Sequence, residues 1–376
     1  MSGVLVLGGY GVFGSRLCGL LTASPDLRVY VAGRRASAAR ALAARLGPAA
    51  EAVELDRDAP DGLAAFLKER HPQVVVDAVG PFQKRDYRLA ELVLAHGAHL
   101  VDLADDRTYV TGIAALDATA RARGLLATSG ASTVPALSGA VVDRLLRELD
   151  SLESVEIGIS PGQRAPRGLS TIRSVLSYCG KAIPAVAPAH RAARRGWGDL
   201  GRHRYPAPVG GRWLSNVDLP DSAVLAARYP GIESIVTRAG LELSVLHLGL
   251  SMLSWMVARG WISNLEPASR TLGAIAALLS PLGSDDGAMH VTVVGGRGGR
   301  RFRRHWTVVA ERNDGPLIPA APASVIAKRL AGVAGYAPLA VRGAMPCVGL
   351  LTLEELMMEL GGRAIRAQMY DEALGS

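Results

Sequence analysis

Short apolar runs alternate with helix-like patterns over the first 130 residues of the chain. Between the runs, apolar residues recur every three to four positions, as they do in a helix that covers a sheet. The runs themselves hold few polar residues, which is typical of parallel strands buried on both faces. We expect strands at residues 4–7, 27–32, 52–55, 74–79, 99–103 and 125–128. This alternation predicts an α/β fold that begins with a doubly wound parallel sheet.

The second half of the chain has a different pattern. We expect a helix at 138–149, a strand at 154–159 and a short helix at 170–179. Two alternating segments, 289–294 and 302–310, flank a glycine-rich turn and predict a β-hairpin. Residues 184–220 show little periodicity and are typical of a substrate loop. A chain of 376 residues is long enough for two domains, so we expect a second, α+β domain with a mixed sheet and helices.

One stretch, residues 241–262, is apolar around most of its circumference. From Val245 to Ala258 it carries no formal charge, and this uncharged run is short for a bilayer span. Three alternatives stay open: a buried core or dimer-interface helix, a helix on a membrane surface, and a true span. A second apolar helix is expected at 268–279. Residues 241–282 therefore predict a hydrophobic surface for peripheral membrane contact, a homodimer or a lipid-like substrate.

A glycine cluster follows the first predicted strand. Its sequence is Gly8-Gly9-Tyr10-Gly11-Val12-Phe13-Gly14, and a helical pattern begins directly behind it. A strand, a tight turn and a helix N-terminus make an anion site, because phosphate can approach the backbone and the first N–H groups of a helix have no internal partner. The spacing Gly9-x-Gly11-x-x-Gly14 fits the dinucleotide fingerprint of Rossmann domains. A glycine-rich turn without a ligand is the alternative.

Two arginines stand where NAD-binding domains usually carry an acidic residue for the ribose 2′-hydroxyl. The second predicted strand is followed by Arg34 and Arg35. A guanidinium pairs well with a 2′-phosphate, so the expected cofactor is NADP(H). The alternative is that both arginines are simply exposed at the start of the next helix. Asp56, after the third strand, could accept a hydrogen bond from the adenine amino group or could cap a turn.

The ends of the later strands add further candidates for cofactor binding, because the carboxyl ends of such strands line the ligand crevice. The fourth strand ends in Val79-Gly80-Pro81-Phe82. The fifth carries Asp102, and the sixth is followed by Gly130. Gly80 would let the cofactor approach and Pro81 would fix the turn. We expect these residues to join the glycine cluster in binding.

The formal net charge of +8 favours anionic partners, such as a phosphorylated cofactor, an acidic substrate, a membrane surface or nucleic acid. The arginine clusters at 191–195 and 300–304 lack a nucleic-acid module or an aromatic ladder, so we expect no nucleic acid. Three cysteines lie far apart without metal spacing, which predicts a reducing, cytoplasmic compartment, no disulfide framework and no metal. The N-terminus lacks the basic region of a signal peptide.

Three motifs together resemble the saccharopine dehydrogenase (saccharopine reductase) family. They are Gly80-Pro81-Phe82, Asp102-Leu103-Ala104-Asp105 and Gly130-Ala131-Ser132-x-x-Pro135-Ala136-Leu137-Ser138. The resemblance implies an N-terminal Rossmann domain, here residues 1–135, and an α+β substrate or dimerisation domain, here 136–344. It also implies C-terminal helices, at about 345–376, that pack back on the first domain. The implied activity is that of an NAD(P)-dependent oxidoreductase, without a defined substrate.

Hydride transfer requires a proton donor or acceptor near the nicotinamide. Asp102 and Asp105 qualify by their place at the end of the fifth strand, and Tyr178 and Lys181 could approach from the second domain. Each has a structural alternative: a turn cap for Asp102, a core position for Tyr178 and a solvated helix end for Lys181. We expect an NADP(H)-dependent oxidoreductase that acts on a small molecule in the cleft between domains. The alternatives are a reductase of lipid-linked enoyl or keto groups at a membrane surface and an inactive nucleotide-binding scaffold.

Overall fold

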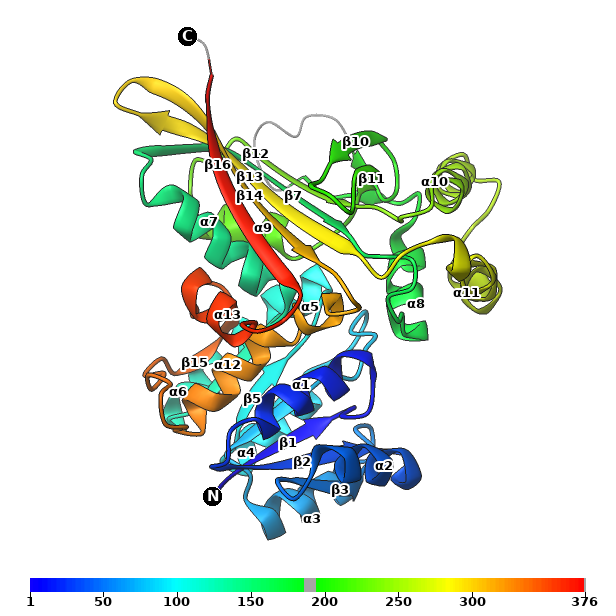
Figure 1. The fold of residues 1–376 in the computed structure, drawn as a ribbon. Helices are drawn as coiled ribbons and strands as arrows, with labels where there is room; N and C mark the ends of the chain where they lie inside the picture. Colours follow the sequence, from blue (N-terminus) through cyan, green and yellow to red (C-terminus); the bar gives the residue numbers. More distant parts are fainter. Residues whose placement is uncertain (186–193, 375–376) are drawn as a thin grey trace. The chain divides into compact units, whose positions relative to one another are not determined.

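The computed structural model describes residues 1–185 and 194–374. The chain divides into two compact units (Figure 1), residues 1–137 with 316–360, and residues 138–315 with 361–376. Two expectations about the domains are therefore wrong. Residues 316–344 belong to the first unit and not to the second, and residues 361–376 belong to the second unit and not to the first.

The first unit contains a seven-stranded parallel sheet in the order β15-β6-β5-β4-β1-β2-β3. Its strands are β1 (Ser2–Leu7), β2 (Leu27–Gly33), β3 (Ala50–Glu54), β4 (Val74–Asp77), β5 (His99–Asp102), β6 (Leu126–Ser129) and β15 (Gly343–Pro346). The predicted doubly wound sheet is confirmed, with β15 as an additional edge strand. Strand β1 lies between β2 and β4, so the strand order reverses beside it. Ligands of such sheets bind at this switch point, outside the carboxyl ends of the strands.

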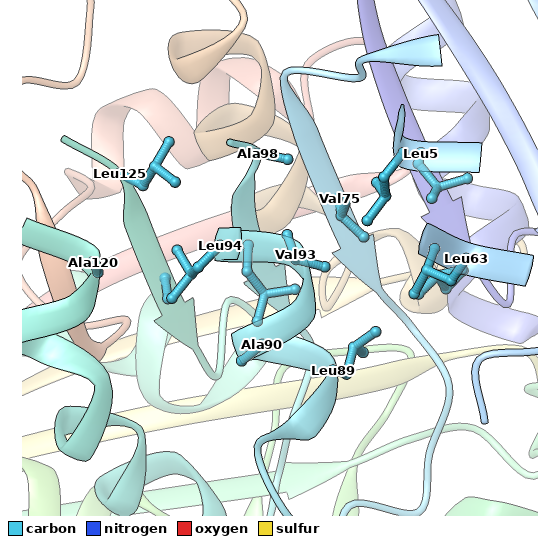
Figure 2. Packing of buried hydrophobic residues seen from close by; sticks show 14 of the residues in the cluster. Leu5, Leu63, Val75, Leu89, Ala90, Val93, Leu94, Ala98, Ala120 and Leu125 are labelled. Atoms are coloured by element: carbon cyan, nitrogen blue, oxygen red, sulfur yellow. The ribbon is translucent and has the colours of Figure 1, made fainter. Parts of the chain in front are cut away.

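Helices cover both faces of this sheet. They are α1 (Val12–Thr22), α2 (Ala36–Leu46), α3 (Pro60–Arg70), α4 (Arg88–Ala95), α5 (Arg107–Gly112), α6 (Asp117–Ala122), α12 (Ala321–Leu330) and α13 (Leu353–Glu359). Helix α1 contacts α2 and α12, whereas α3 contacts α4. Figure 2 shows how Val93 and Leu94 of α4 and Leu63 of α3 pack with Leu5 of β1 and Val75 of β4, all buried in one cluster. This packing holds the strand ends in fixed positions.

The second unit contains a mixed sheet in the order β10-β11-β12-β7-β13-β14-β16. Its strands are β7 (Ser151–Ser160), β10 (Gly201–Arg204), β11 (Gly211–Asn216), β12 (Ser234–Ala239), β13 (Gly287–Arg297), β14 (Arg300–Ala310) and β16 (Ile365–Leu374). Strand β12 runs parallel to β7, and the other neighbours are antiparallel. The expected hairpin is confirmed as β13 and β14. Strands β10 and β11 were not expected, and a short pair, β8 (Ala182–Ile183) and β9 (Arg194–Arg195), lies beside them in the sequence.

Strand β16 corrects the expectation of C-terminal helices at 345–376. Within the described part of that range, α13 is helical, and residues 365–374 pair antiparallel with β14. Ion pairs join Arg303 to Glu372 at 3.1 Å and Arg304 to Asp371 at 2.8 Å. The alanine, arginine and glutamate content of this segment favours a helix locally, but its partner strand lies some 60 residues earlier in the chain, as the Arg304–Asp371 pairing illustrates.

The helices of the second unit form two groups (Figure 1). Helices α7 (Ser138–Leu146) and α9 (Asp221–Arg228) contact each other and strands of the mixed sheet. Helices α8 (Leu169–Tyr178), α10 (Ser244–Ala258) and α11 (Ser269–Leu278) share a separate apolar cluster that includes Trp197. The expected apolar helices thus exist, with slightly different bounds.

Short turns of other helix types complete the two units. They are η1 (Ile113–Leu116), η2 (Thr133–Leu137), η3 (Glu266–Ala268), η4 (Ser280–Leu282) and η5 (Gly315–Leu317). The segment between α5 and β6 is divided into η1 and α6.

Candidate functional site

The glycine turn between β1 and α1 requires its glycines for steric reasons. Gly8 has φ of +73°, in the left-handed region. A β-carbon on Gly14 would lie 2.1 Å from the carbonyl oxygen of Gly8, so α1 packs directly against the turn. The turn is closed by a hydrogen bond of 2.8 Å from the Gly11 N–H to that same oxygen. Side chains at Gly8 and Gly14 would clash with neighbouring atoms of the turn and of the segment after β4.

The N-terminus of α1 is open toward an anion. Its N-cap is Gly11, which has no side chain to cap the helix, and its first turn carries no acidic residue. The dipole of a helix favours negative charge at this end. The first turn starts at Val12 and Phe13, both partly exposed. Its backbone N–H groups are therefore suited to a phosphate group, as in other helix N-termini that bind anions.

Tyr10 connects the glycine turn to the end of β2. Its ring lies so close to Gly33 that a β-carbon there would come within 2.4 Å of it. The Tyr10 hydroxyl accepts a hydrogen bond of 2.9 Å from the backbone N–H of Arg35. The Arg35 guanidinium carbon lies 5.2 Å from the centre of the Tyr10 ring, a cation–π distance. Tyr10 thus fixes the segment that carries the two arginines beside the turn.

Arg34 and Arg35 are both exposed. Within residues 1–185 and 194–374, the Arg34 side chain has no hydrogen bond or ion pair, so its charge is available to a ligand. The residues present therefore fit a dinucleotide that carries an extra phosphate near the end of β2. The tight glycine turn and the uncapped helix N-terminus suit the pyrophosphate of such a ligand, and the free guanidinium suits its extra phosphate.

The segment after β4 lies against the glycine turn. A β-carbon on Gly8 would come within 2.9 Å of a methyl group of Val79. The Val79 N–H donates to the buried carboxylate of Asp77 at 3.0 Å, and Arg57 Nε donates to its other oxygen at 2.7 Å. Gly80 and Pro81 follow and are partly exposed, whereas Phe82 is buried against Tyr109.

The pair of Arg57 and Asp77 was not expected from the sequence. The available signal was the single carboxylate that closes an otherwise apolar strand, residues 74–77. Its partner follows β3, which is separated from β4 by two strands in the sheet order. No local pattern links the two positions.

Asp102 is fully buried at the end of β5. Its Oδ1 accepts three hydrogen bonds, from the Ala104 N–H at 3.0 Å, the Ser129 hydroxyl at 2.8 Å and the Gly130 N–H at 2.9 Å. Its Oδ2 is buried without a hydrogen-bond partner in the described part of the chain. Burial raises the pKa of Asp102 to about 7. These contacts fit the alternative of a turn cap, because Asp102 holds the loops after β5 and β6 and is shielded from solvent.

Three further candidates have local roles in the structure. Gly130 has φ of +81°, and a β-carbon there would lie 2.5 Å from the ring of Pro135. Asp105 is partly exposed and accepts a hydrogen bond of 3.5 Å from Gln83. Asp56 accepts a hydrogen bond of 3.0 Å from the N–H two residues later, which is a turn-capping contact. Of the expected acid–base candidates in the first unit, Asp105 is thus the more accessible to a substrate.

Tyr178 and Lys181 lie in the second unit, at the end of α8. Tyr178 packs against the apolar cluster of α8, α10 and α11. Lys181 is exposed, and its ammonium group donates to the carbonyl oxygen of Ser177 in the last turn of α8. These contacts are those of a core residue and of a helix end.

The arginine cluster on β14 is largely paired with carboxylates. Arg301 pairs with Glu153 at 2.6 Å, and Arg303 and Arg304 pair with residues of β16. In the other cluster, Arg191 lies outside the described residues. The three cysteines, Cys18, Cys179 and Cys347, are buried and form no disulfide bond. Across residues 1–185 and 194–374, no group of histidine, cysteine and acidic side chains is arranged to hold a metal ion.

Comparisons with known proteins agree with this geometry. Residues 4–131 match the family model described as the saccharopine dehydrogenase NADP binding domain. The fold is similar to that of apo saccharopine dehydrogenase (L-Glu forming) from Saccharomyces cerevisiae, with a TM-score of 0.66 and 14% identity over 98% of this chain and 100% of the other. An amine dehydrogenase from Mycobacterium smegmatis aligns with a TM-score of 0.48 and 12% identity, over 92% of this chain and 94% of the other. No curated protein sequence matches the chain.

The parallel sheet, the glycine turn at its switch point and the open N-terminus of α1 define a Rossmann-type dinucleotide-binding domain. The family model indicates the particular type that this domain resembles: residues 4–131 match the saccharopine dehydrogenase NADP binding domain. The resemblance inferred from the Gly80, Asp102 and Gly130 motifs is confirmed for this domain. The likeness of the whole chain to the yeast enzyme extends the agreement in fold to the second unit.

Proposed function

We propose that this protein is an NADP(H)-dependent oxidoreductase that transfers a hydride to or from a small-molecule substrate. One observation carries the proposal. The glycine turn is shaped for a pyrophosphate, and Tyr10 fixes Arg35 beside it while the Arg34 guanidinium stays without a partner in the described part of the chain. NADP carries a phosphate on its adenosine ribose that NAD lacks, and a free guanidinium is the usual partner of such a group.

The protein's own residues would hold and orient this cofactor. The N–H groups of the first turn of α1 would bind the pyrophosphate, and Arg34 the 2′-phosphate. Val79 and Gly80 would line the crevice beyond the turn. The carboxylate of Asp77, which is paired with Arg57, holds the backbone N–H of Val79 in place. The nicotinamide ring would supply or accept the hydride. Asp105, at the partly exposed end of the same sheet edge, is the proposed proton donor or acceptor.

The direct test is turnover. We would follow the loss of NADPH absorbance with imines formed from 2-oxo acids and amines, and with apolar enoyl and keto substrates. We expect turnover on at least one member of the panel, and we expect Asp105→Asn to lower kcat while leaving the dissociation constant of NADPH unchanged. Tight NADPH binding without turnover on any of these substrates would instead support the inactive scaffold.

A second candidate is a reductase of lipid-linked enoyl or keto groups. It is favoured by the exposed apolar side chains between residues 245 and 282. In that case the apolar members of the panel would turn over, and mixed micelles or vesicles that present the substrate would raise kcat/KM. Activity confined to water-soluble imines would contradict this candidate.

A further inference from the structure

Helix α10 turns a row of large apolar side chains toward solvent. Val245, Leu248, Met252 and Trp255 are spaced three or four residues apart, so they share one face of the helix. They are 67%, 39%, 59% and 47% exposed. The alternative of a fully buried core helix, one of those left open by the sequence, is therefore wrong for this face.

Polar contacts fix the opposite face of α10 to the rest of the second unit. His247 is fully buried. Its Nε2 is hydrogen-bonded to the Ser215 hydroxyl at 3.0 Å, and its Nδ1 accepts a hydrogen bond of 3.2 Å from the Leu241 N–H. The Ser254 hydroxyl donates to the carbonyl oxygen of Gly196 at 2.7 Å. These contacts set the rotation of the helix about its axis. The contacts of the helix with the rest of the unit thus fix the outward direction of the apolar row.

The exposed apolar surface continues beyond α10. Trp261 packs edge-on against Trp255, with ring centres 5.0 Å apart, and it is 67% exposed. On α11 and the turn behind it, Ile275, Leu278 and Leu282 are exposed as well. Helices α10 and α11 pack on the same apolar cluster and lie at one side of the second unit (Figure 1). We call this surface the α10–α11 face; it comprises Val245, Leu248, Met252, Trp255, Trp261, Ile275, Leu278 and Leu282.

Three arginines lie around the α10–α11 face. The Arg259 guanidinium lies 5.4 Å from the centre of the Trp255 ring, at the end of α10. Arg270 is exposed on α11, and exposed Arg164 donates to the carbonyl oxygen of Pro281 at 3.1 Å, next to Leu282. The nearby acidic residues are Glu266 and the partly exposed Asp285 and Asp286, which follow Leu282. An apolar patch bordered by tryptophan and arginine suits the headgroup region of an anionic bilayer.

We propose that the α10–α11 face docks on the surface of a membrane that contains anionic phospholipids. A second copy of the chain fits less well, because a two-fold contact would bring Arg259 beside Trp255 close to the same arginine of the other copy. None of the described helices is both long and apolar enough to cross a membrane, so the contact is one at the surface. Apolar side chains enter the interface, and the arginines bind headgroup phosphates. The proposal does not depend on the nucleotide site.

The test is co-sedimentation of the purified full chain with vesicles of phosphatidylcholine alone or mixed with phosphatidylglycerol. We expect binding to the mixed vesicles that weakens as salt is raised. The double variant Met252→Gln with Trp255→Gln keeps the charge and should lower partitioning more than tenfold. Arg259→Gln with Arg270→Gln should remove the preference for anionic vesicles. Met358→Gln, which changes an 80% exposed methionine of the first unit, is the matched control and should bind as the wild type does.

Three results would overturn the proposal. One is the absence of binding to anionic vesicles at low salt by a protein whose unfolding temperature and NADPH affinity show it to be folded. The second is a stable dimer in sedimentation velocity that the Met252→Gln/Trp255→Gln variant converts to a monomer, because the face would then be covered by a second copy. The third is unchanged partitioning of the double variant, which would place the membrane contact elsewhere.

Discussion

The buried carboxylate of Asp102 accepts a hydrogen bond from the backbone N–H of Gly130 at 2.9 Å, and so joins the end of β5 to the loop after β6. The same oxygen also binds the Ser129 hydroxyl. One side chain thus holds two neighbouring loops at the carboxyl edge of the sheet, where a dinucleotide would bind. The sequence analysis proposed Asp102 at this edge as a candidate acid or base, and its observed contacts are those of a turn cap.

The burial of Asp102 makes stability depend on pH. Its pKa is raised from 3.8 to about 7 in the folded protein, so the folded state binds more protons than the unfolded state between these values. Its contribution is most favourable below the unfolded pKa and is lost as the pH rises through the window. Relative to Asp102→Asn, the wild type should lose on the order of 4 kcal/mol of unfolding free energy across that window. Urea unfolding of both proteins at several pH values measures this, and a pH-independent difference would refute it.

Two glycines in α1 provide a matched pair of substitutions. A β-carbon on Gly14 would lie 2.1 Å from the backbone oxygen of Gly8, whereas one on Gly19 would meet nothing closer than 3.9 Å. Gly14→Ala should therefore destabilise the protein by roughly 2 kcal/mol or more and abolish NADPH binding. Gly19→Ala should stabilise it by up to about 1 kcal/mol, because alanine is the better helix former. Thermal unfolding and NADPH titration of both variants measure these changes in stability and affinity. Equal effects of the two substitutions would mean that α1 does not pack on the turn as described.

The Arg57–Asp77 pair should be important for stability. Their side chains are 6% and 1% exposed, so Arg57→Met would leave a buried carboxylate without its charged partner. We expect a loss of about 3–5 kcal/mol, and part of it should return when Asp77→Asn is added. The exposed pair of Arg121 and Asp117 is the control, and Arg121→Met should cost less than about 1 kcal/mol. Comparable losses from the two methionine variants in urea unfolding would contradict the assigned burial.

Features that depend on neighbouring residues could be predicted from the sequence. The glycine turn follows from a strand, a run of glycines and a helical pattern within residues 4–21, and six of the seven strands of the first sheet follow from apolar runs. Arg34 and Arg35 follow from their place after β2. The β13–β14 hairpin could also be predicted, because its two strands are neighbours in the sequence.

Features that depend on distant partners could not be predicted in the same way. Strand β15 has four residues that include glycine and proline, and it becomes a strand by pairing with β6, which lies more than 200 residues earlier. Strand β16 has a helix-like composition and is fixed by ion pairs to β14. The three donors to Asp102 come from two different loops. The outward direction of the α10 row depends on the contact of His247 with Ser215 of strand β11.

The measurement that tests the central claim most directly is a paired titration with NADPH and NADH. It compares the wild type with Arg34→Ala and with Arg45→Ala, which removes an equal charge from the far end of α2, about 15 Å along the helix. We predict that NADPH binds more tightly than NADH, and that Arg34→Ala weakens NADPH at least tenfold while NADH is unaffected. Arg45→Ala should leave both affinities unchanged. Equal affinities that Arg34→Ala does not alter would contradict the role of Arg34, and the absence of binding by either nucleotide would contradict the proposed function itself.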